Sequence, residues 1–396
     1  MRTQPQKLAE FFNIGRDRGW DVEKQAWTVH QLINPEGKVF TLGEILDGIP
    51  LDLKLTKSGN RYGYPPLRET IIKTCGYNVT KEHVLITSGT QHANFLSLAV
   101  RLEPGDEAIV EAPSWEQPRV VCETLGVNVR ILRRRPELEW KFDLNELESL
   151  MGPKVKLIYV CHPSNPTGAT LAERELKEIC RIADRHGAYV ISDEIYRGLE
   201  WEGGLSPAVV NYYERGVSTA SVSKTLGMSG TRLGWLATQD RRLLEDCMDL
   251  KYYVSLHQQS RLDEIVATAA LQPEKYWGLV NETMRAARVN YDITMQWITS
   301  NGTFKGAMPK GGFLMFPSYD LDVASWDLCL RLLEPPYKTY ILPGSCYGVE
   351  GHVRLGFGPG TPPHSMREGL EQVSSFVADY KAGRVKIAAT MPALST

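Results

Sequence analysis

Residues 156–193 read KLIYVCHPSNPTGATLAERELKEICRIADRHGAYVISD and carry the clearest structural pattern in the chain. The continuous apolar run at 157–160 predicts a buried strand, which His162-Pro163 ends, and Tyr189 begins a second strand. The helix between them is indicated by a capping box, apolar residues at helical spacing and a final glycine: Thr170, Glu173, Leu176, Ile179, Cys180, Ala183 and Gly187. The stretch therefore predicts a strand–helix–strand unit with a right-handed crossover.

The same alternation continues on both sides of this unit. Short apolar runs rich in Val and Ile lie at 84–87, 107–112, 127–132, 155–161, 188–193, 217–222 and 234–237. Such runs, separated by amphipathic stretches, predict an α/β fold with a mainly parallel sheet covered by helices on both faces. After about residue 280 the rhythm changes, and strands are expected at 311–313 and 352–357. We predict a large domain at 51–285 and a smaller α+β domain made of residues 1–50 and 286–396.

Composition narrows the classes of function. The 396 residues hold 45 Lys and Arg against 47 Asp and Glu, a net charge of −2, so no general attraction to nucleic acid or to an anionic membrane is expected. No apolar run approaches the roughly 20 residues of a membrane span, and residues 1–16 lack the features of a signal peptide. The seven cysteines include no Cys-x-x-Cys pair, which argues for a reducing compartment and against structural zinc. We expect a cytoplasmic enzyme without a catalytic metal, and we interpret Arg133-Arg134-Arg135 as a solvated loop.

Polar residues follow four predicted strands, at the end where ligands bind in open α/β sheets. Ser88-Gly89-Thr90-Gln91 opens a helix and suits a phosphate, although a plain helix cap has the same pattern. The other three groups are Asn165 between two prolines, Asp193, and Lys224 with Ser221, Ser223 and Arg232. Taken singly, a tight turn explains Asn165 and a helix cap explains Asp193. Burial of Lys224 lowers its pKa, however, and makes the amine available as nucleophile or base.

An asparagine, an acid, a reactive lysine and a phosphate cradle together suit one cofactor, pyridoxal 5′-phosphate, held as a Schiff base with the acid on its pyridine nitrogen. At this point the chain resembles the class I and II aminotransferases of the fold-type-I pyridoxal-phosphate family. The resemblance covers residues 62–358 and rests on NPTG at 165–168, DEIY at 193–196 and SVSK at 221–224, followed by Arg232. It implies a large domain with a mainly parallel sheet and a smaller α+β domain.

The resemblance implies a role for each matching residue. Lys224 would bind the cofactor and move the proton at the substrate Cα, with Asp193 and Tyr196 completing the catalytic set. The cofactor would be held by Tyr62, Ser88, Gly89, Thr90, Trp115, Asn165, Asp193, Tyr196, Ser221, Ser223, Lys224 and Arg232. Arg354 and Asn165 would bind the substrate, with Arg354 gripping its α-carboxylate. Tyr62 would reach the phosphate of the neighbouring subunit, which implies a homodimer with shared sites.

Several functions use this same set of residues. The first is an aminotransferase that takes nitrogen from an α-amino acid and passes it to a 2-oxo acid. Residues 196–200 and 342–345, with Tyr347-Gly348, resemble a branch that includes capreomycidine synthase-type enzymes, which eliminate, cyclise or oxidise amino acids with the same cofactor. A non-catalytic relative would have no need of both Lys224 and Asp193. The chain departs from the family between Tyr62 and Arg68, which is short, and residues 1–50 match no pattern.

Overall fold

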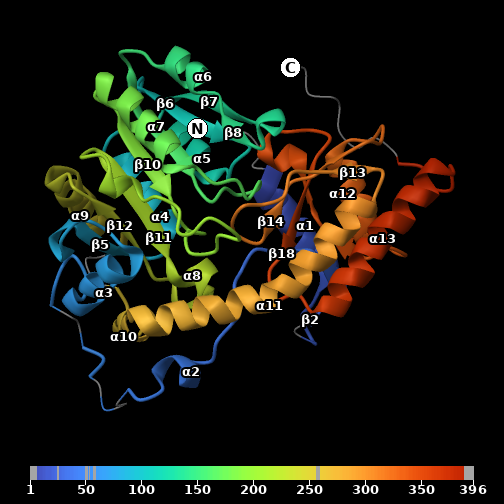
Figure 1. Cartoon of the computed structure of the whole chain (residues 1–396), viewed down its shortest axis with the longest axis horizontal. Helices are drawn as coiled ribbons and strands as arrows, with labels where there is room; N and C mark the ends of the chain where they lie inside the picture. Colours follow the sequence, from blue (N-terminus) through green and yellow to red (C-terminus); the bar gives the residue numbers. More distant parts are fainter. Residues whose placement is uncertain are drawn as a thin grey trace.

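The computed structural model describes residues 7–24, 26–49, 52, 54–56, 59–255 and 259–387, and it is built around an eight-stranded sheet (Figure 1). In spatial order the strands are β5 (Val84–Thr87), β12 (Gly234–Thr238), β11 (Gly216–Ser221), β10 (Tyr189–Asp193), β9 (Val155–Cys161), β6 (Glu107–Ala112), β7 (Asn128–Arg135) and β8 (Lys141–Phe142). The strands from β11 to β7 pair in parallel, whereas β12, β5 and β8 pair antiparallel to their neighbours. The predicted α/β fold with a mainly parallel sheet is confirmed.

Alternate residues of each central strand face opposite layers of helices. On β9, Leu157 and Tyr159 belong to a core shared with α4 (Thr90–Ala99), α5 (Gln117–Thr124) and α9 (Arg241–Ser255). Ile158 and Val160 face a second core, shared with α6 (Leu144–Leu150) and α7 (Glu173–Arg185). Because both faces of the sheet are covered, its strands appear in the sequence as continuous apolar runs.

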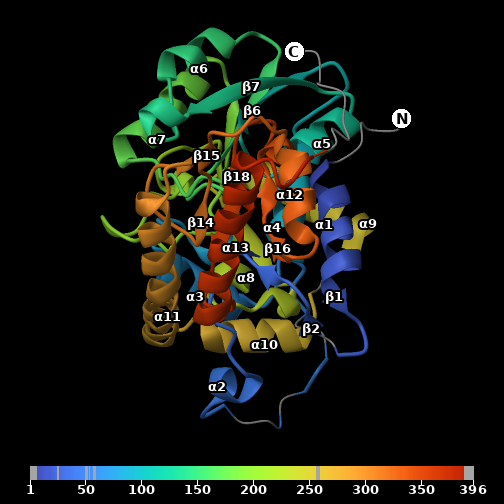
Figure 2. The same ribbon diagram turned by 90° about the vertical axis from the view of Figure 1, so that its right-hand side faces the viewer.

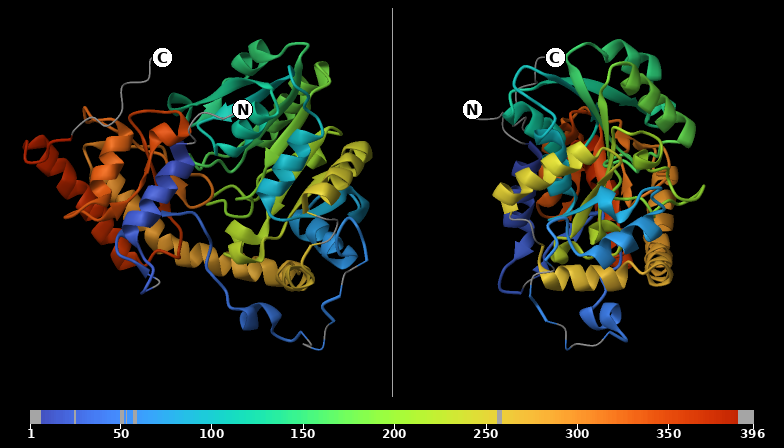
Figure 3. Two further views of the ribbon diagram at one scale, coloured as in Figure 1. Left: turned by 180° about the vertical axis from the view of Figure 1, so that it is seen from behind. Right: turned by 90° about the vertical axis from the view of Figure 1, so that its left-hand side faces the viewer.

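Residues from both ends of the chain form a second lobe beside the sheet (Figures 1 and 3). Parallel pairs join β3 (His30–Gln31) to β16 (Thr339–Tyr340) and β4 (Ile33–Asn34) to β18 (Val353–Phe357). Helix α1 (Lys7–Gly19) packs on α12 (Ser325–Leu333), where the ring centroids of Phe11 and Trp326 lie 4.9 Å apart. Helices α11 (Pro273–Ser300) and α13 (Pro363–Lys381) lie side by side in this lobe (Figure 2).

The division into two domains stays a prediction. Its expected boundary at residue 285 falls inside α11, a continuous helix that runs from beneath the sheet into the second lobe (Figure 1). Residues 1–6 and 388–396 of the predicted small domain lie outside the described residues.

The remaining elements are two helices of 11 and 10 residues, α3 and α10, and a set of shorter segments. They are β1 (Trp20–Asp21), β2 (Ala26–Trp27), α2 (Leu42–Leu46), α3 (Pro65–Cys75), α8 (Val222–Thr225), α10 (Arg261–Ala270), β13 (Phe304–Lys305), β14 (Leu314–Met315), β15 (Ser318–Tyr319), β17 (Leu342–Pro343) and 3₁₀ turns at Lys81–His83, Pro136–Leu138, Val209–Asn211, Ser229–Thr231 and Gly344–Tyr347. Within the described ranges, no helix has the length and apolar character to cross a membrane.

The predicted capping box of Thr170 and Glu173 is wrong. Helix α7 begins at Glu173 itself, and the amide of Ala172 donates to the Glu175 carboxylate at 2.7 Å. Glu173 pairs instead with Lys177 one turn along the helix, at 2.6 Å. The spacing of an acid three residues after a hydroxyl occurs here by coincidence, because a second glutamate two positions later caps the helix.

Two further local predictions are wrong. The strand expected at 311–313 lies instead at Leu314–Met315, and Gly311 makes only an isolated bridge to Glu200. A Cβ on Gly311 would come 2.7 Å from Pro163, so this position serves close packing on a neighbouring loop. The arginine run at 133–135 is not a solvated loop but the end of β7, where Arg134 is buried and pairs with the buried Glu111 at 2.8 Å.

Candidate active site

Ten of the thirteen predicted site residues line a cavity of about 520 Å³ at the carboxyl ends of β9, β10 and β11. The predicted residues that line it are Thr90, Trp115, Asn165, Asp193, Tyr196, Ser221, Ser223, Lys224, Arg232 and Arg354. Residues that the sequence did not indicate complete the lining, among them Phe12, Gln31, Ile33, Asn34, Pro35 and Glu36. The cavity therefore lies between the sheet and the second lobe, and both contribute side chains.

Asp193 ends β10 and is held in one orientation by donors on both carboxylate oxygens. Its Oδ2 accepts hydrogen bonds from Asn94 Nδ2 at 2.8 Å and from the Tyr159 hydroxyl at 3.0 Å, and its Oδ1 accepts from the Ile195 amide at 3.1 Å. Burial raises the pKa of Asp193 above its ordinary value, and the side-chain donors oppose that rise. A carboxylate fixed in this way is suited to pairing with a cationic ring nitrogen that enters the cavity.

Lys224 lies on the short helix α8, which begins directly after β11. The Ser221 hydroxyl accepts the Ser223 amide at 3.3 Å and caps this turn. Lys224 Nζ lies 3.0 Å from Glu36 Oε1. Burial lowers the pKa of Lys224; Glu36 opposes this effect, and the nearby Arg354 and Arg232 add to it. Burial therefore makes the amine less basic than that of an exposed lysine, and Glu36 stands beside it as a counter-ion.

The start of α4 and Arg232 form an anion-binding corner of the cavity. Gly89 has a φ of +82°, and a Cβ there would lie 2.7 Å from Arg232 Nη2, so only glycine lets the guanidinium pack against this turn. Thr90 Oγ1 is buried in the same corner without a hydrogen-bond partner among the described residues. A guanidinium, an unpartnered hydroxyl and the amides of a helix N-terminus converge as a phosphate requires.

Arg354 extends from β18 into the opposite part of the cavity and is buried. Its Nη1 donates to the Tyr347 hydroxyl at 3.0 Å and to Asn165 Oδ1 at 3.4 Å, and its Nη2 donates to the Ile33 carbonyl at 2.6 Å. Its Nε has no partner in the described part of the chain. A planar cation fixed from three sides is suited to gripping a carboxylate.

Two aromatic side chains complete the cavity wall. Tyr196 is almost fully buried, and burial raises the pKa of its phenol, so the hydroxyl keeps its proton and can donate it in a hydrogen bond. Trp115 is half-buried just after β6, and its ring lies 6.3 Å from that of Phe12 on α1. The indole offers a flat apolar surface on which an aromatic ring can pack.

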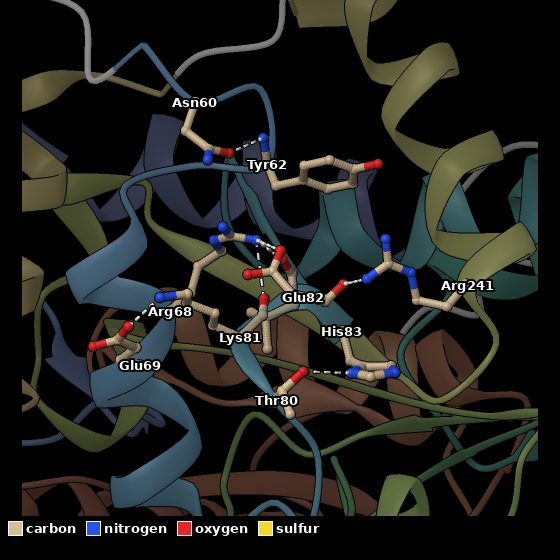
Figure 4. Close-up of polar contacts among 10 residues, drawn as sticks. Asn60, Tyr62, Arg68, Glu69, Thr80, Lys81, Glu82, His83 and Arg241 are labelled. Carbon is tan, nitrogen blue, oxygen red and sulfur yellow. Dashed lines mark hydrogen bonds and ion pairs between the residues drawn. The ribbon is translucent and has the colours of Figure 1, made fainter.

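Tyr62 and Ser88 lie outside the lining of the cavity, and Gly89 lies behind Arg232. The Ser88 hydroxyl donates to Gln259 Oε1 at 3.0 Å. Figure 4 shows the Tyr62 amide bonded to Asn60 Oδ1, at 3.0 Å, and Arg68 beneath the Tyr62 ring, where Arg68 Cζ is 5.7 Å from the ring centroid. Arg68 also donates to the Lys81 carbonyl at 2.9 Å, which joins α3 to the 3₁₀ turn before β5 (Figure 4). The cofactor roles of these residues stay predictions.

Sequence reasoning missed four side chains that organise the site. Asn94 and Tyr159 hold Asp193, Tyr347 holds Arg354, and Glu36 pairs with Lys224. Asn94 lies one helical turn after Thr90, and Tyr159 lies two residues before Cys161, so helix and strand periodicity place both toward the site. Glu36 has no such signal, because its segment shows no periodicity.

These features fit pyridoxal phosphate, the cofactor expected from the sequence. The anion corner at Thr90 and Arg232 suits its phosphate, and the buried Asp193 carboxylate suits its pyridine nitrogen. Lys224 Nζ opens on the same cavity. The orphaned Thr90 hydroxyl and the tight approach of Arg232 to Gly89 are the structural details that favour a phosphate there.

Comparisons with known proteins agree with this fit. The family model described as "Aminotransferase class I and II" matches residues 51–373. An aspartate aminotransferase of Pyrococcus horikoshii is 28% identical over 329 residues, covering 81% of this chain and 82% of that protein. A capreomycidine synthase of Streptomyces vinaceus is 26% identical and covers 76% of each chain. The crystal structure of a PLP-dependent aminotransferase from Streptococcus suis superposes with a TM-score of 0.85 and 26% identity, covering 96% of this chain and 99% of that chain.

Proposed function

The chain belongs to the class I and II aminotransferases, and from that membership we propose a role for each residue of the site. It is a pyridoxal-phosphate-dependent enzyme that acts at the Cα of an α-amino acid, with the activity of an aminotransferase. One observation carries the assignment of roles: Lys224, Asp193, Arg232 and Arg354 reach a single cavity from four different parts of the chain.

The cofactor-binding residues divide by the part of the cofactor that they meet. Arg232, Thr90, Ser221 and Ser223, with the turn at Ser88-Gly89, hold the phosphate. Asp193 pairs with the pyridine nitrogen, Asn165 and Tyr196 hydrogen-bond to the ring oxygen, and Trp115 packs on the ring. Bound pyridoxal phosphate supplies an electron sink that stabilises negative charge at the substrate Cα.

The remaining residues handle the substrate and its proton. Arg354 binds the α-carboxylate with two parallel hydrogen bonds and so orients the Cα–H bond toward Lys224. Lys224 Nζ, made less basic by burial, takes the proton from Cα. Asn165 accepts a hydrogen bond from Arg354 and would, as a ligand of the ring oxygen, tie the position of this arginine to that of the cofactor.

The substrates that we propose are an α-amino acid donor and a 2-oxo acid acceptor. We also propose that the enzyme is a homodimer in which Tyr62 serves the neighbouring subunit, since Tyr62 does not line the cavity of its own chain. We propose that the partner binds at α9 and α10, where large apolar side chains are exposed. Among them are Tyr253 on α9, which is 85% exposed, and Leu262 on α10. We further propose that the enzyme is located in the cytoplasm.

A half-reaction tests the assignment. The purified yellow protein is mixed with single amino acids in the absence of any 2-oxo acid, and the absorption of the cofactor and the mass of the product are followed. Conversion of the cofactor to its amine form with one equivalent of 2-oxo acid is the expected result. Lys224→Ala should lack the absorption band of the covalent bond between the lysine and the cofactor. Its activity should be at least about 1000-fold lower than that of the wild type, since the variant loses both the amine that forms this bond and the base that takes the proton. Lys177→Ala, which removes an exposed lysine on α7, is the control.

The same experiment decides the second candidate, a lyase, cyclase or oxidase, which the likeness to a capreomycidine synthase favours. Continued turnover with the cofactor still an aldehyde, releasing ammonia or a cyclised or oxidised product, would replace the aminotransferase. Full turnover by Lys224→Ala would contradict both functions.

A further inference from the structure

The N-terminal segment at 33–37 is bonded directly to the residues of the site. The Ile33 carbonyl accepts from Arg354 Nη2 at 2.6 Å, and the Gly37 amide donates to the Lys224 carbonyl at 2.8 Å. A Cβ on Gly37 would lie 2.8 Å from that same carbonyl, so glycine allows this close approach. Glu36 lies between the two anchors, and its own amide donates to Asn34 Oδ1 at 2.9 Å. The backbone around Glu36 is therefore fixed relative to Lys224.

Both oxygens of the Glu36 carboxylate have partners in the cavity. Oε1 accepts from Lys224 Nζ at 3.0 Å, and Oε2 accepts from the Ser229 hydroxyl at 3.1 Å. The two charged side chains are mostly buried, with 21% of Lys224 and 29% of Glu36 exposed. A pair with this geometry and burial is worth more than a surface ion pair, because screening by water is weaker.

The other charged groups around Lys224 have roles in the proposed function, whereas Glu36 has none. The charged groups that act on the amine are Glu36, Arg354 from β18 and Arg232 from the loop before β12. Asp193 at the end of β10 and Tyr196 in the turn after it line the same cavity. In the proposed function the two arginines and Asp193 bind the carboxylate, phosphate and ring nitrogen. Glu36 is the remaining acid among the described residues of the lining, and it opposes the two arginines at Lys224 Nζ.

We propose that Glu36 is a positioning residue that holds the Lys224 amine and sets its affinity for a proton. The proposal rests on the proposed function, in which Lys224 takes the proton from the substrate Cα. The amine becomes an ammonium at that moment, and the Glu36 carboxylate accepts a hydrogen bond from it and keeps it in the cavity. The N-terminal segment, for which the sequence offered no role, thus supplies the counter-ion of the reactive lysine.

The experiment compares wild type with Glu36→Gln, which keeps the shape and removes the charge. The reactivity of Lys224 toward acetic anhydride is measured by mass spectrometry in the cofactor-free protein as a function of pH. In the loaded protein, the visible absorption is titrated with pH. We expect the midpoint of both curves to fall by about 1 to 3 pH units, the usual effect of losing an opposite charge within about 4–6 Å. Labelling below the midpoint should rise about tenfold for each unit.

Three further variants separate the ion pair from a merely structural role. Glu36→Asp keeps the charge and should recover part of the shift. Ser229→Ala removes the hydroxyl on Oε2 and should shift the midpoint in the same direction by less, even if Glu36→Gln does not fold. Glu282→Gln is the matched control, since Glu282 forms an ion pair with Lys38, two residues after Glu36 in the chain, and should leave both curves unchanged.

Unchanged curves for Glu36→Gln and Ser229→Ala would overturn the proposal. A shift of equal size in Glu282→Gln would do the same, because the effect would then not belong to the contact with Lys224. Failure of the proposed function gives a different result: Lys224→Ala would keep its covalent yellow band, whatever Glu36→Gln does.

Discussion

At the scale of single residues, the site is organised by buried polar groups that bond to one another. Thr219 donates to Asn94 at 2.6 Å, Asn94 donates to Asp193, and Tyr159 donates to the same carboxylate. His162, next to this network, is fully buried, and neither ring nitrogen has a partner in the described part of the chain. Burial lowers the pKa of His162 to about 3, so the imidazole is neutral in the folded protein.

His162 makes the fold sensitive to acid. Its pKa is about 3 when folded and about 6.5 when unfolded, so the unfolded chain binds the proton first and stability falls as the pH drops below about 6.5. Between pH 7 and pH 5 this one group should cost about 2 kcal/mol of unfolding free energy. His162→Gln should remove that part of the loss, measured by urea unfolding at both pH values. His186→Gln, on the surface, is the control, and an equal loss in all three proteins would contradict the prediction.

The residues that could be predicted from sequence share one property. Asn165, Asp193 and Lys224 follow buried strands, and the carboxyl ends of such strands meet at one edge of a sheet. Glu36 could not be found in this way, because its partner lies 188 positions away and its segment has no periodicity. Tyr347 was noted only as part of a motif, since a contact with Arg354 depends on how the chain turns between them.

At the scale of elements, the strands were predictable and the turns were less so. β5, β6 and β9 begin and end where their apolar runs predict, because a sheet covered on both faces needs continuous apolar residues. The end of β7 was missed because Arg134 is buried against Glu111, a pairing that needs a neighbouring strand. The failed strand at 311–313 and the misplaced cap at Thr170 both depended on packing that local sequence does not contain.

Close packing of β12 on the turn before α4 yields a prediction for cofactor affinity. A Cβ on Gly234 would lie 2.5 Å from the carbonyl carbon of Gly89 and 2.8 Å from the Ala220 carbonyl oxygen. Gly234→Ala must therefore displace the turn that carries Thr90, and the dissociation constant for pyridoxal phosphate should rise about tenfold or more. Fluorescence titration of the cofactor-free protein measures it.

The control for that substitution is also a glycine-to-alanine change. Gly278 lies on the exposed side of α11 with open space around its Cα, so Gly278→Ala should leave the affinity unchanged and add about 0.5–1 kcal/mol to the unfolding free energy. An affinity unchanged in Gly234→Ala would mean that the turn tolerates the added methyl group.

At the scale of the whole molecule, the site lies between parts of the chain that are far apart in sequence. The sheet supplies Asp193, the short helix after β11 supplies Lys224, the N-terminal segment supplies Glu36, and the C-terminal lobe supplies Arg354. From the sequence, only the contributions of residues 62–358, which the family resemblance covers, could be predicted. The contributions of residues 1–50 needed the structure, because β3 and β4 are two residues each and pair with strands more than 300 positions later.

The proposed homodimer can be tested at the exposed end of α9. Tyr253→Asp places a charge on a side chain that is 85% exposed and would be buried against the partner. We expect the dissociation constant of the dimer to rise at least about tenfold, measured by sedimentation, with activity falling as the monomer forms. Val289→Asp, on α11, is the control. This surface would be ruled out if the wild-type protein sedimented as a monomer. It would also be ruled out if the dissociation constant of the Tyr253→Asp dimer equalled that of the wild type.

The pairing of β4 with β18 has a consequence for how the enzyme is made. A ribosome delivers Arg354 321 residues after Ile33, yet the carbonyl of Ile33 holds the guanidinium of Arg354. During translation the nascent chain can build its central strands first, but the substrate-binding end of the pocket has to wait until β18 has been synthesised. Maturation to a catalytically competent enzyme is therefore a late step, which follows the synthesis of β18.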